Sequence, residues 1–390
     1  MSKKTEVIIT GIGQIPVGEH WETSLRSMAG KAMRNAIADS GMMKPQALYV
    51  GNMLASTLSR QAHLGVLLAD FSGFIGIEAE TLEAGGASGG SALRQGYLAV
   101  ASGMVDVALV VGVEKFTDTI GPEGESALAT LTDADYESVH GLTVTAQAAL
   151  LECRYLHENQ VPADGLAGFP LTAHENAVGN KNAMYRKPIS LETYQKAELV
   201  CSPLNLYDIS PTADGAAAII LTRRELLSSR YQNPVIHVAA STVGSDTLSL
   251  AERADPLWFS SAQASIEAAY EKAEIKPEHV DLFEYHDVYS IYAALSLEAA
   301  GFARRGHGWQ LAADGAIALT GQIPCATLGG SKARGNPGGA TGIYQAVEAT
   351  LQLRGQAGAN QIGDAKTALI QSLGGPASVA VTHILVREDE

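Results

Sequence analysis

The stretch TLEAGGASGGSALRQGYLAVASG, residues 81–103, decides the fold. A glycine-rich turn opens here into a largely apolar helix, in which Arg94 and Gln95 are the main polar side chains apart from two serines. Such a helix is buried over most of its surface, so its N-terminus points into the protein. The free amides and the positive end of the helix dipole then favour a developing negative charge. The sequence therefore predicts the floor of an active site at this turn.

Strand-like runs alternate with helical patterns along the rest of the chain. The helical patterns lie near residues 24–40, 88–103, 260–274, 289–301 and 339–354. The strand-like runs are 7–10, 105–113, 216–222, 235–240, 280–285, 368–373 and 377–385. This alternation predicts an α/β protein with buried, partly parallel sheets.

One order of elements occurs twice. A glycine-rich loop, a long helix and a strand follow one another from residue 89 to 113 and again from 338 to 373, which indicates an internal duplication. The polar segment 223–233 separates two strands and is the candidate boundary, at about residue 230. Residues from about 115 to 205 interrupt the alternation and are interpreted as an insertion.

Composition and charge narrow the function. The chain has 390 residues, 46% of them hydrophobic, so it can bury a large core. A formal charge of −15 makes nucleic-acid binding an unfavourable interpretation. The cysteines Cys153, Cys201 and Cys325 are widely spaced, which indicates neither a disulfide framework nor a metal site. With no apparent signal peptide and no apolar run of membrane-spanning length, we expect a cytoplasmic protein.

Residues 83–115, EAGGASGGSALRQGYLAVASGMVDVALVVGVEK, resemble the nucleophile region of thiolases, in particular the branch of sterol carrier protein X and archaeal acetyl-CoA acetyltransferase. In that family this turn carries the acyl-accepting cysteine, and the matching position here is Gly86. The resemblance implies a five-layer αβαβα sandwich of two duplicated halves, residues 1–230 and 231–390. It also implies that the insertion is a cap that covers the active site and contacts coenzyme A.

Two further interpretations of this turn stay open. Paired glycines are most often a tight turn that needs a positive φ, and Gly85 and Gly86 fit that explanation. The segment 86–90 also matches the G-x-S-x-G pattern of α/β-hydrolases, with Ser88 as nucleophile, although a serine at a helix start is more often a cap. In the thiolase interpretation Ser88 contributes to substrate binding. A glycine at position 86 has no side chain on which an acyl group could be carried.

The segment YHDVYS, residues 285–290, follows a predicted strand and resembles the His-Asp-x-Phe motif of thiolases. The resemblance implies that His286 helps to bind the thioester oxygen. Tyr289 stands at the phenylalanine position, and its hydroxyl is our candidate for proton transfer. A structural histidine and a core tyrosine are the alternatives for these two residues.

Two loops of the second half complete the predicted site. The loop GGSKARGNPGGATG, residues 329–342, resembles the thiolase loop whose histidine activates the cysteine, and Asn336 stands at that position. Its amide can donate to an oxyanion but cannot act as a base, and a plain turn residue is the alternative. In QSLGGPA, residues 371–377, Ser372 replaces the second cysteine of many thiolases, and Gly374 and Gly375 form the adjoining loop.

Basic residues of the cap are the candidate contacts for the coenzyme. Lys181, Arg186 and Lys187 form a small cluster suited to a phosphate or pyrophosphate group, and a solvated charge group is the alternative. Cys325 is the cysteine nearest to the predicted site loops in the sequence, and we interpret it as a buried structural residue.

The missing cysteine, base and second acid favour chemistry without a covalent intermediate. We expect a protein that acts on acyl-CoA thioesters, by aldol or retro-aldol reaction of a β-hydroxyacyl-CoA, with coenzyme A thioester as its ligand and no covalently bound cofactor. Tyr289 is the candidate base for the β-hydroxyl in that reaction. The alternatives are an acetyl-CoA C-acyltransferase and a non-catalytic acyl-CoA-binding scaffold. The resemblance implies a homodimer or a dimer of dimers that pairs through the edge of the first-half sheet. Residues 105–113, with the loop from Thr81, are apolar enough to lie near such a seam. The resemblance also implies a zinc-ribbon/OB-fold partner.

Overall fold

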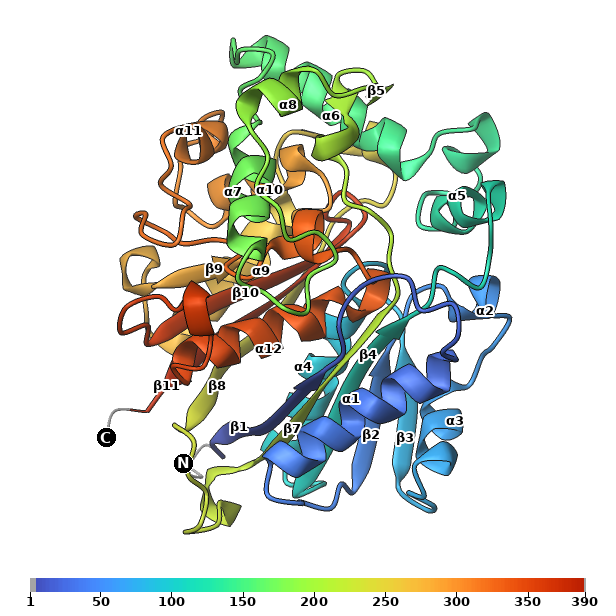
Figure 1. Ribbon diagram of the computed structural model, residues 1–390, viewed down its shortest axis with the longest axis vertical. Coiled ribbons are helices and arrows are strands. Elements are labelled where there is room, and N and C mark those ends of the chain that lie inside the picture. The colour runs from blue at the N-terminus through green and yellow to red at the C-terminus, as the bar shows by residue number, and fades with distance from the viewer. Residues whose placement is uncertain (1–4, 389–390) are drawn as a thin grey trace.

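The computed structural model describes residues 5–388 (Figure 1). The strands are β1 Val7–Gln14, β2 Ala47–Gly51, β3 Glu78–Leu82, β4 Val107–Glu114, β5 Leu199–Cys201, β6 Leu204–Asn205, β7 Gly215–Arg223, β8 Ile236–Ser245, β9 Leu282–Glu284, β10 Thr367–Gly374 and β11 Val379–Arg387. The α-helices are α1 Leu25–Asp39, α2 Ala55–Leu58, α3 Leu64–Phe71, α4 Ser88–Ala101, α5 Pro122–Ala129, α6 Val144–Glu158, α7 Gly168–Ala177, α8 Leu191–Gln195, α9 Ser260–Ala273, α10 Ser290–Ala299, α11 Gly308–Ala313 and α12 Thr341–Leu353.

Nine strands form the main sheet, in the order β3-β2-β4-β7-β1-β8-β11-β10-β9. Strand β1 pairs with β8 only through Ile8–His237 and Ile9–Ile236, so the sheet consists of two parts joined at one short contact. In the first part, β2 is parallel to β4, while β4–β7 and β7–β1 are antiparallel pairs. In the second part, β9 is parallel to β10, while β10–β11 and β11–β8 are antiparallel pairs. This repetition agrees with the duplication expected from the sequence.

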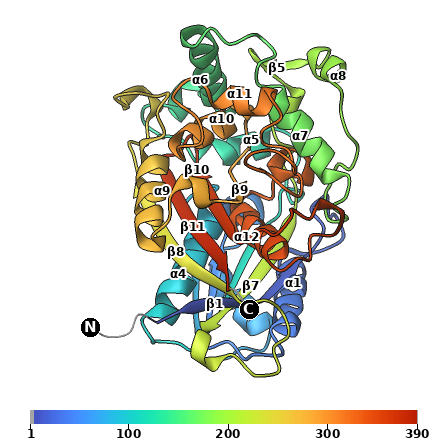
Figure 2. The ribbon, with the colours of Figure 1, turned by 90° about the vertical axis from the view of Figure 1, so that its left-hand side faces the viewer.

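The buried side chains form clusters that divide the helices and the two parts of the sheet into five layers. Helices α1 and α3 cover the outer face of the first part, where their apolar side chains pack on β2, β4 and β7. Helices α4 and α12 share one cluster with both parts of the sheet and form the central layer. Helices α9 and α10 pack on the outer face of the second part, and Figure 2 shows α9 lying along β8 and β11. The predicted αβαβα sandwich is confirmed.

The two central helices meet at their N-termini because glycines occupy the contact. A Cβ at Gly89 would lie 2.7 Å from the carbonyl oxygen of Gly339, and a Cβ at Gly342 would lie 2.5 Å from the amide nitrogen of Gly90. Neither position has room for a side chain, which is the close-approach use of glycine. The turn before α4 and the loop before α12 are thereby brought to one place.

All seven predicted strands and all five predicted helices are present, with ends shifted by a few residues. Outside the cap, strands β2 and β3 and helices α2, α3 and α11 were not predicted. Residues 105–113, which were expected near a dimer seam together with the loop from Thr81, form an interior strand, since β4 pairs with both β2 and β7, and the seam itself stays a prediction. The edge of the first part is β3. A short apolar strand paired on both sides is what an interior position requires.

The segment between β4 and β7 contributes no strand to the main sheet. It contains α5 to α8 and the two-stranded sheet β5-β6, and lies along the top of Figure 1, in teal to green. The predicted boundary at residue 230 falls in the loop between β7 and β8, and the division into two domains stays a prediction. Among residues 5–388, no helix is long and apolar enough to cross a membrane, and no His/Cys/Asp/Glu group is arranged to hold a metal ion.

Candidate active site

A cavity of about 200 Å³ lies where the cap meets the N-terminal ends of α4 and α12. Five predicted site residues line it, from four separate segments of the chain: Gly86, His286, Tyr289, Asn336 and Gly375. The meeting of the two helix N-termini accounts for the presence of Gly86 and Asn336 together. Apolar side chains complete much of the wall, among them Leu128, Leu131, Val144, Val288 and Leu373.

Gly86 and His286 are in close contact across the cavity floor. A Cβ at position 86 would lie 3.0 Å from His286 Nε2 and 2.7 Å from the carbonyl oxygen of Leu373. The second distance is shorter than any real Cβ contact, so the backbone has closed onto the space that a side chain would need. Gly85, with a φ of +56°, supplies the left-handed conformation of the turn.

The imidazole of His286 is neutral at physiological pH. Burial, aided by the positive charge of Arg334, lowers the pKa of His286 to about 3. Its Nδ1 atom is buried and has no hydrogen-bond partner among the described residues. A neutral imidazole can donate one hydrogen bond to an oxyanion without carrying a charge into the site.

Asn336 is held by its neighbour in the same loop. The Thr341 hydroxyl donates to Asn336 Oδ1 at 3.0 Å, which leaves the Nδ2 group as the donor end of the amide. Asn336 N also donates to Pro211 O, so the loop is tied to the segment that leads into β7. The amide is therefore an oriented donor at the cavity.

Tyr289 precedes α10 and reaches the cap. Its hydroxyl and that of Thr145 lie 2.9 Å apart. Burial raises the pKa of Tyr289 to about 12, so the phenol keeps its proton at neutral pH. Tyr289 was expected to be the base for the β-hydroxyl. Because its phenol is protonated at neutral pH, it can relay or donate a proton but cannot serve unaided as the base.

Of the predicted residues outside the cap, Ser88, Ser372 and Gly374 do not line the cavity. The Ser88 hydroxyl donates to Gly85 O at 2.6 Å and accepts from Ala84 N at 2.9 Å, so it shapes the turn and does not face a substrate. The Ser372 hydroxyl donates at 2.9 Å to Oε1 of Gln345, which lies on α12. Successive strand residues point to opposite faces, so Leu373 takes the place expected for Ser372.

A second, larger cavity of about 780 Å³ adjoins the first, because Ile209 and Ser210 line both. Arg186 and Lys187 lie at its exposed side, as expected for a phosphate contact. Lys181 is exposed and is not among the residues that line it. The phosphate-binding role of these residues stays a prediction.

None of the residues that line the first cavity is a cysteine. Cys325 is fully buried against β9, its thiol lies 3.1 Å from Ile323 O, and burial raises its pKa well above the ordinary value. A thiol in this environment is inert. Cys153 and Cys201 lie in the cap.

Sequence reasoning missed several residues of the site. Tyr292 lines the cavity three residues after Tyr289, and that spacing on a helix was a signal that both share one face. Thr145 and Met53 come from segments with no motif, and only the tertiary structure brings them to the cavity.

Comparison with known proteins places this arrangement in a family. Residues 6–225 match the family described as "Thiolase, N-terminal domain", and residues 242–387 match "Thiolase C-terminal domain-like". The chain belongs to the thiolase family. An acetyl-CoA acetyltransferase of Methanothermobacter thermautotrophicus is 37% identical over 98% of this chain and 100% of its own length.

Other thiolase-family relatives are more distant. The benzoylsuccinyl-CoA thiolase subunit BbsB of Thauera aromatica is 28% identical over 93% of this chain and 92% of its own length. The solved structure of the Ltp2-ChsH2(DUF35) aldolase has a TM-score of 0.83 at 23% identity and covers 99% of this chain and 98% of its own. At 23% identity, this similarity shows the fold alone. A human mitochondrial 3-ketoacyl-CoA thiolase in complex with CoA has the same fold, with a TM-score of 0.74 at 16% identity over 99% of this chain and 98% of its own.

Proposed function

We propose that this thiolase-family protein binds an acyl-CoA thioester and makes or breaks a carbon–carbon bond in it without forming an acyl-enzyme. The observation that carries the proposal is the composition of the cavity: Gly86, His286 and Asn336 line it together, and no cysteine does. The two side chains offer neutral, fixed donors to a developing oxyanion, and a thioester carbonyl develops that charge when it becomes an enolate.

The proposed reaction is retro-aldol cleavage of a β-hydroxyacyl-CoA or its reverse. The β-hydroxyl loses its proton, its oxygen forms a carbonyl, the Cα–Cβ bond breaks, and the electron pair moves into the thioester enolate. His286 and Asn336 stabilise that enolate through their N–H groups. A proton added at Cα then gives the shortened acyl-CoA, so the two products are an aldehyde or ketone and a thioester.

The proton of the β-hydroxyl needs a route out of the cavity. Tyr289 is neutral, so we assign it the role of a relay that receives this proton as it passes its own onward. Glu125 is the carboxylate among the lining residues, and it bears electrostatically on Tyr289, so we assign it as the final acceptor. Glu125 is exposed to solvent, where the proton is released.

The coenzyme portion of the thioester is proposed to occupy the larger cavity. It adjoins the first cavity at Ser210, and its basic residues Arg186 and Lys187 suit phosphate groups. The solved aldolase of similar fold is described with a DUF35 component, and we carry a partner protein of that kind into the proposal. We also propose that the protein forms a homodimer or a dimer of dimers.

A second candidate is the acyl transfer named for the 37% identical acetyltransferase. One experiment separates the candidates. The protein is incubated with short β-hydroxyacyl-CoA and β-ketoacyl-CoA thioesters, with and without free coenzyme A, and the products are followed by liquid chromatography and mass spectrometry. We expect an aldehyde or ketone and a shortened acyl-CoA from a hydroxyacyl thioester alone. Cleavage of a ketoacyl thioester that depends on added coenzyme A would support acyl transfer, and binding without turnover would support a scaffold.

A further inference from the structure

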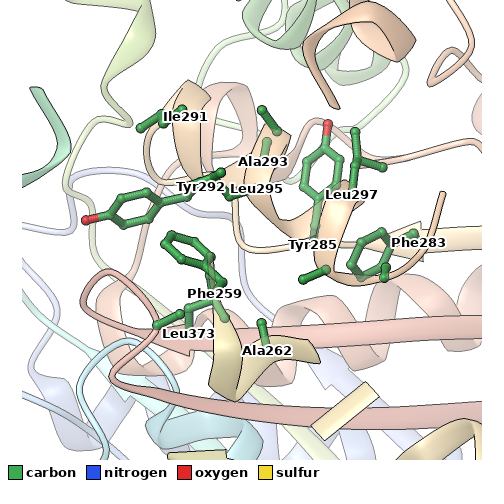
Figure 3. Close-up of a cluster of buried hydrophobic side chains, with 14 of the residues drawn as sticks. Phe259, Ala262, Phe283, Tyr285, Ile291, Tyr292, Ala293, Leu295, Leu297 and Leu373 are labelled. Atoms are coloured by element: carbon green, nitrogen blue, oxygen red, sulfur yellow. The ribbon is translucent and has the colours of Figure 1, made fainter. Parts of the chain in front are cut away.

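Tyr292 is a buried hydroxyl at the cavity that the proposed reaction does not use. It lies on α10, its side chain is 2% exposed, and it lines the same cavity as His286 and Asn336. Its Oη atom has no hydrogen-bond partner within residues 5–388. Figure 3 shows the Tyr292 hydroxyl pointing out of the apolar cluster formed by its neighbours. A buried donor of this kind is costly unless something else accepts from it.

The ring of Tyr292 is held in place on two sides. The ring of Phe259 packs edge-on against it with centroids 5.6 Å apart, and the ring of Tyr289 does so at 5.0 Å. Burial raises the pKa of Tyr292 well above its ordinary value, so the hydroxyl keeps its proton. The result is a rigid, neutral donor whose position is set before any ligand enters.

Two other hydroxyls at the cavity, those of Tyr289 and Ser210, already have partners. Tyr289 is paired with Thr145, and Ser210 donates to Asp287 O at 3.2 Å. The adjacent wall is apolar at Val144 and Val288. The cavity thus combines apolar walls with a few oriented hydroxyls, of which that of Tyr292 is buried without a partner among the described residues, and this is the usual composition of a selective small-molecule pocket.

We infer that the acyl group of the substrate is small and carries, besides the thioester and the β-hydroxyl, an oxygen atom that accepts a hydrogen bond from Tyr292 Oη. The inference rests on the proposed function, since it assumes that the acyl group occupies this cavity. A volume of about 200 Å³ suits one ring or a short chain, because an apolar cavity of ~150 Å³ accommodates benzene. A purely hydrocarbon acyl group would leave the donor unpaired, and such a site discriminates strongly against ligands that lack the polar group.

The test compares ether-containing acyl-CoA thioesters with hydrocarbon thioesters of the same chain length. Methoxyacetyl-CoA is paired with butanoyl-CoA, methoxypropanoyl-CoA with pentanoyl-CoA, and methoxybutanoyl-CoA with hexanoyl-CoA. The ether oxygen accepts hydrogen bonds but has no proton to lose, so these thioesters report binding and not cleavage. Dissociation constants are measured by calorimetry for the wild-type protein, for Tyr292→Phe, and for Tyr270→Phe as a matched control. Tyr270 is not among the cavity-lining residues, and its hydroxyl donates to Ala300 O.

We expect at least one ether to bind the wild type roughly 5- to 150-fold more tightly than its hydrocarbon partner. The preference should disappear in Tyr292→Phe and persist in Tyr270→Phe. If the wild type binds the thioesters with no preference for any ether, or if the preference survives in Tyr292→Phe, the inference is overturned while the proposed function stands. If no thioester binds at all, the proposed function fails and this inference fails with it.

Discussion

His286 directs its Nε2 atom at the turn that contains Gly86, so that a Cβ at position 86 would lie 3.0 Å from that nitrogen. In the tautomer with the proton on Nε2, this places a donor beside a backbone that has no side chain to hold an acyl group. The same position lies 2.7 Å from the carbonyl oxygen of Leu373, which shows that the turn is packed for glycine. A non-covalent mechanism is the chemistry that this arrangement favours.

Replacing His286 by alanine should lower turnover far more than it weakens ligand binding. Loss of one oxyanion donor costs on the order of 10²–10³ in kcat, because the donor acts mainly on the charge of the transition state. Steady-state kinetics of cleavage and the dissociation constant of an unreactive acyl-CoA measure the two effects. The exposed His157→Ala is the control. Equal losses in kcat and in affinity would mean that His286 serves ground-state binding instead.

The same histidine should give no kinetic step near neutral pH. With a pKa of about 3, His286 stays neutral from pH 5 to 8, so kcat should show no limb from its ionisation in that range. Its folded pKa is lower than the unfolded value of 6.5. The contribution of His286 to stability is therefore complete above pH 6.5 and declines as the pH falls toward 3. A limb near pH 6.5 that is absent in His286→Gln would contradict this assignment.

The change Tyr289→Phe tests the proton relay and keeps the ring that packs on Tyr292. Loss of a positioned proton-transfer group costs about 10²–10⁴ in rate, and we expect kcat to fall within that range. Thr145→Val should have a smaller effect, because it removes the partner of the hydroxyl and not the hydroxyl itself. Since the pKa of Tyr289 is about 12, its ionisation should not shape the profile below pH 10. Unchanged kcat in Tyr289→Phe would remove it from the mechanism.

Glu114, at the end of β4, connects the loop that holds Asn336 to the segment that follows β2. Its Oε2 accepts from Met53 N at 2.9 Å and from Gly339 N at 3.1 Å, and its Oε1 accepts from Asn52 Nδ2 at 2.8 Å. Glu114→Gln would place an amide N–H₂ against N–H donors, so we expect a loss of about 1–3 kcal/mol in the free energy of unfolding. Kinetic measurements should also show a lower kcat, because Gly339 lies in the same loop as Asn336.

The pH dependence of stability gives Glu114 a second readout. Burial raises its pKa from 4.5 to about 7, so between these values the folded protein keeps a proton that the unfolded chain loses. The contribution of Glu114 to stability therefore falls as the pH rises from 4.5 to 7. Denaturant unfolding across that range should show a slope that Glu114→Gln removes and that the exposed Glu271→Gln retains. Identical slopes in all three proteins would refute the assignment.

Much of the fold was readable from the sequence, because the glycine-rich loops and the apolar strands β4, β7 and β10 carry local signals. Strand β3 was missed since EAETL is a charged edge strand, with Glu78 and Glu80 exposed and no apolar run. Ser372 was expected in the cavity wall, but the next residue, Leu373, lies there. A shift of one residue turns a strand side chain to the opposite face of the sheet. Contacts between the cap and the second half, such as Thr145 with Tyr289, are 144 residues apart in the chain and leave no local pattern.

Intact-protein mass spectrometry after rapid mixing with acetyl-CoA tests the central claim most directly. The wild type, Gly86→Cys and Gly86→Ala are compared, the alanine variant carrying the crowded Cβ without a thiol. We predict an unmodified wild type and Gly86→Ala, and slow acetylation of Gly86→Cys, because Asn336 cannot act as the base for the thiol. An acetyl group on the wild-type chain, mapped by peptide analysis to Ser88 or Cys325, would contradict the non-covalent account.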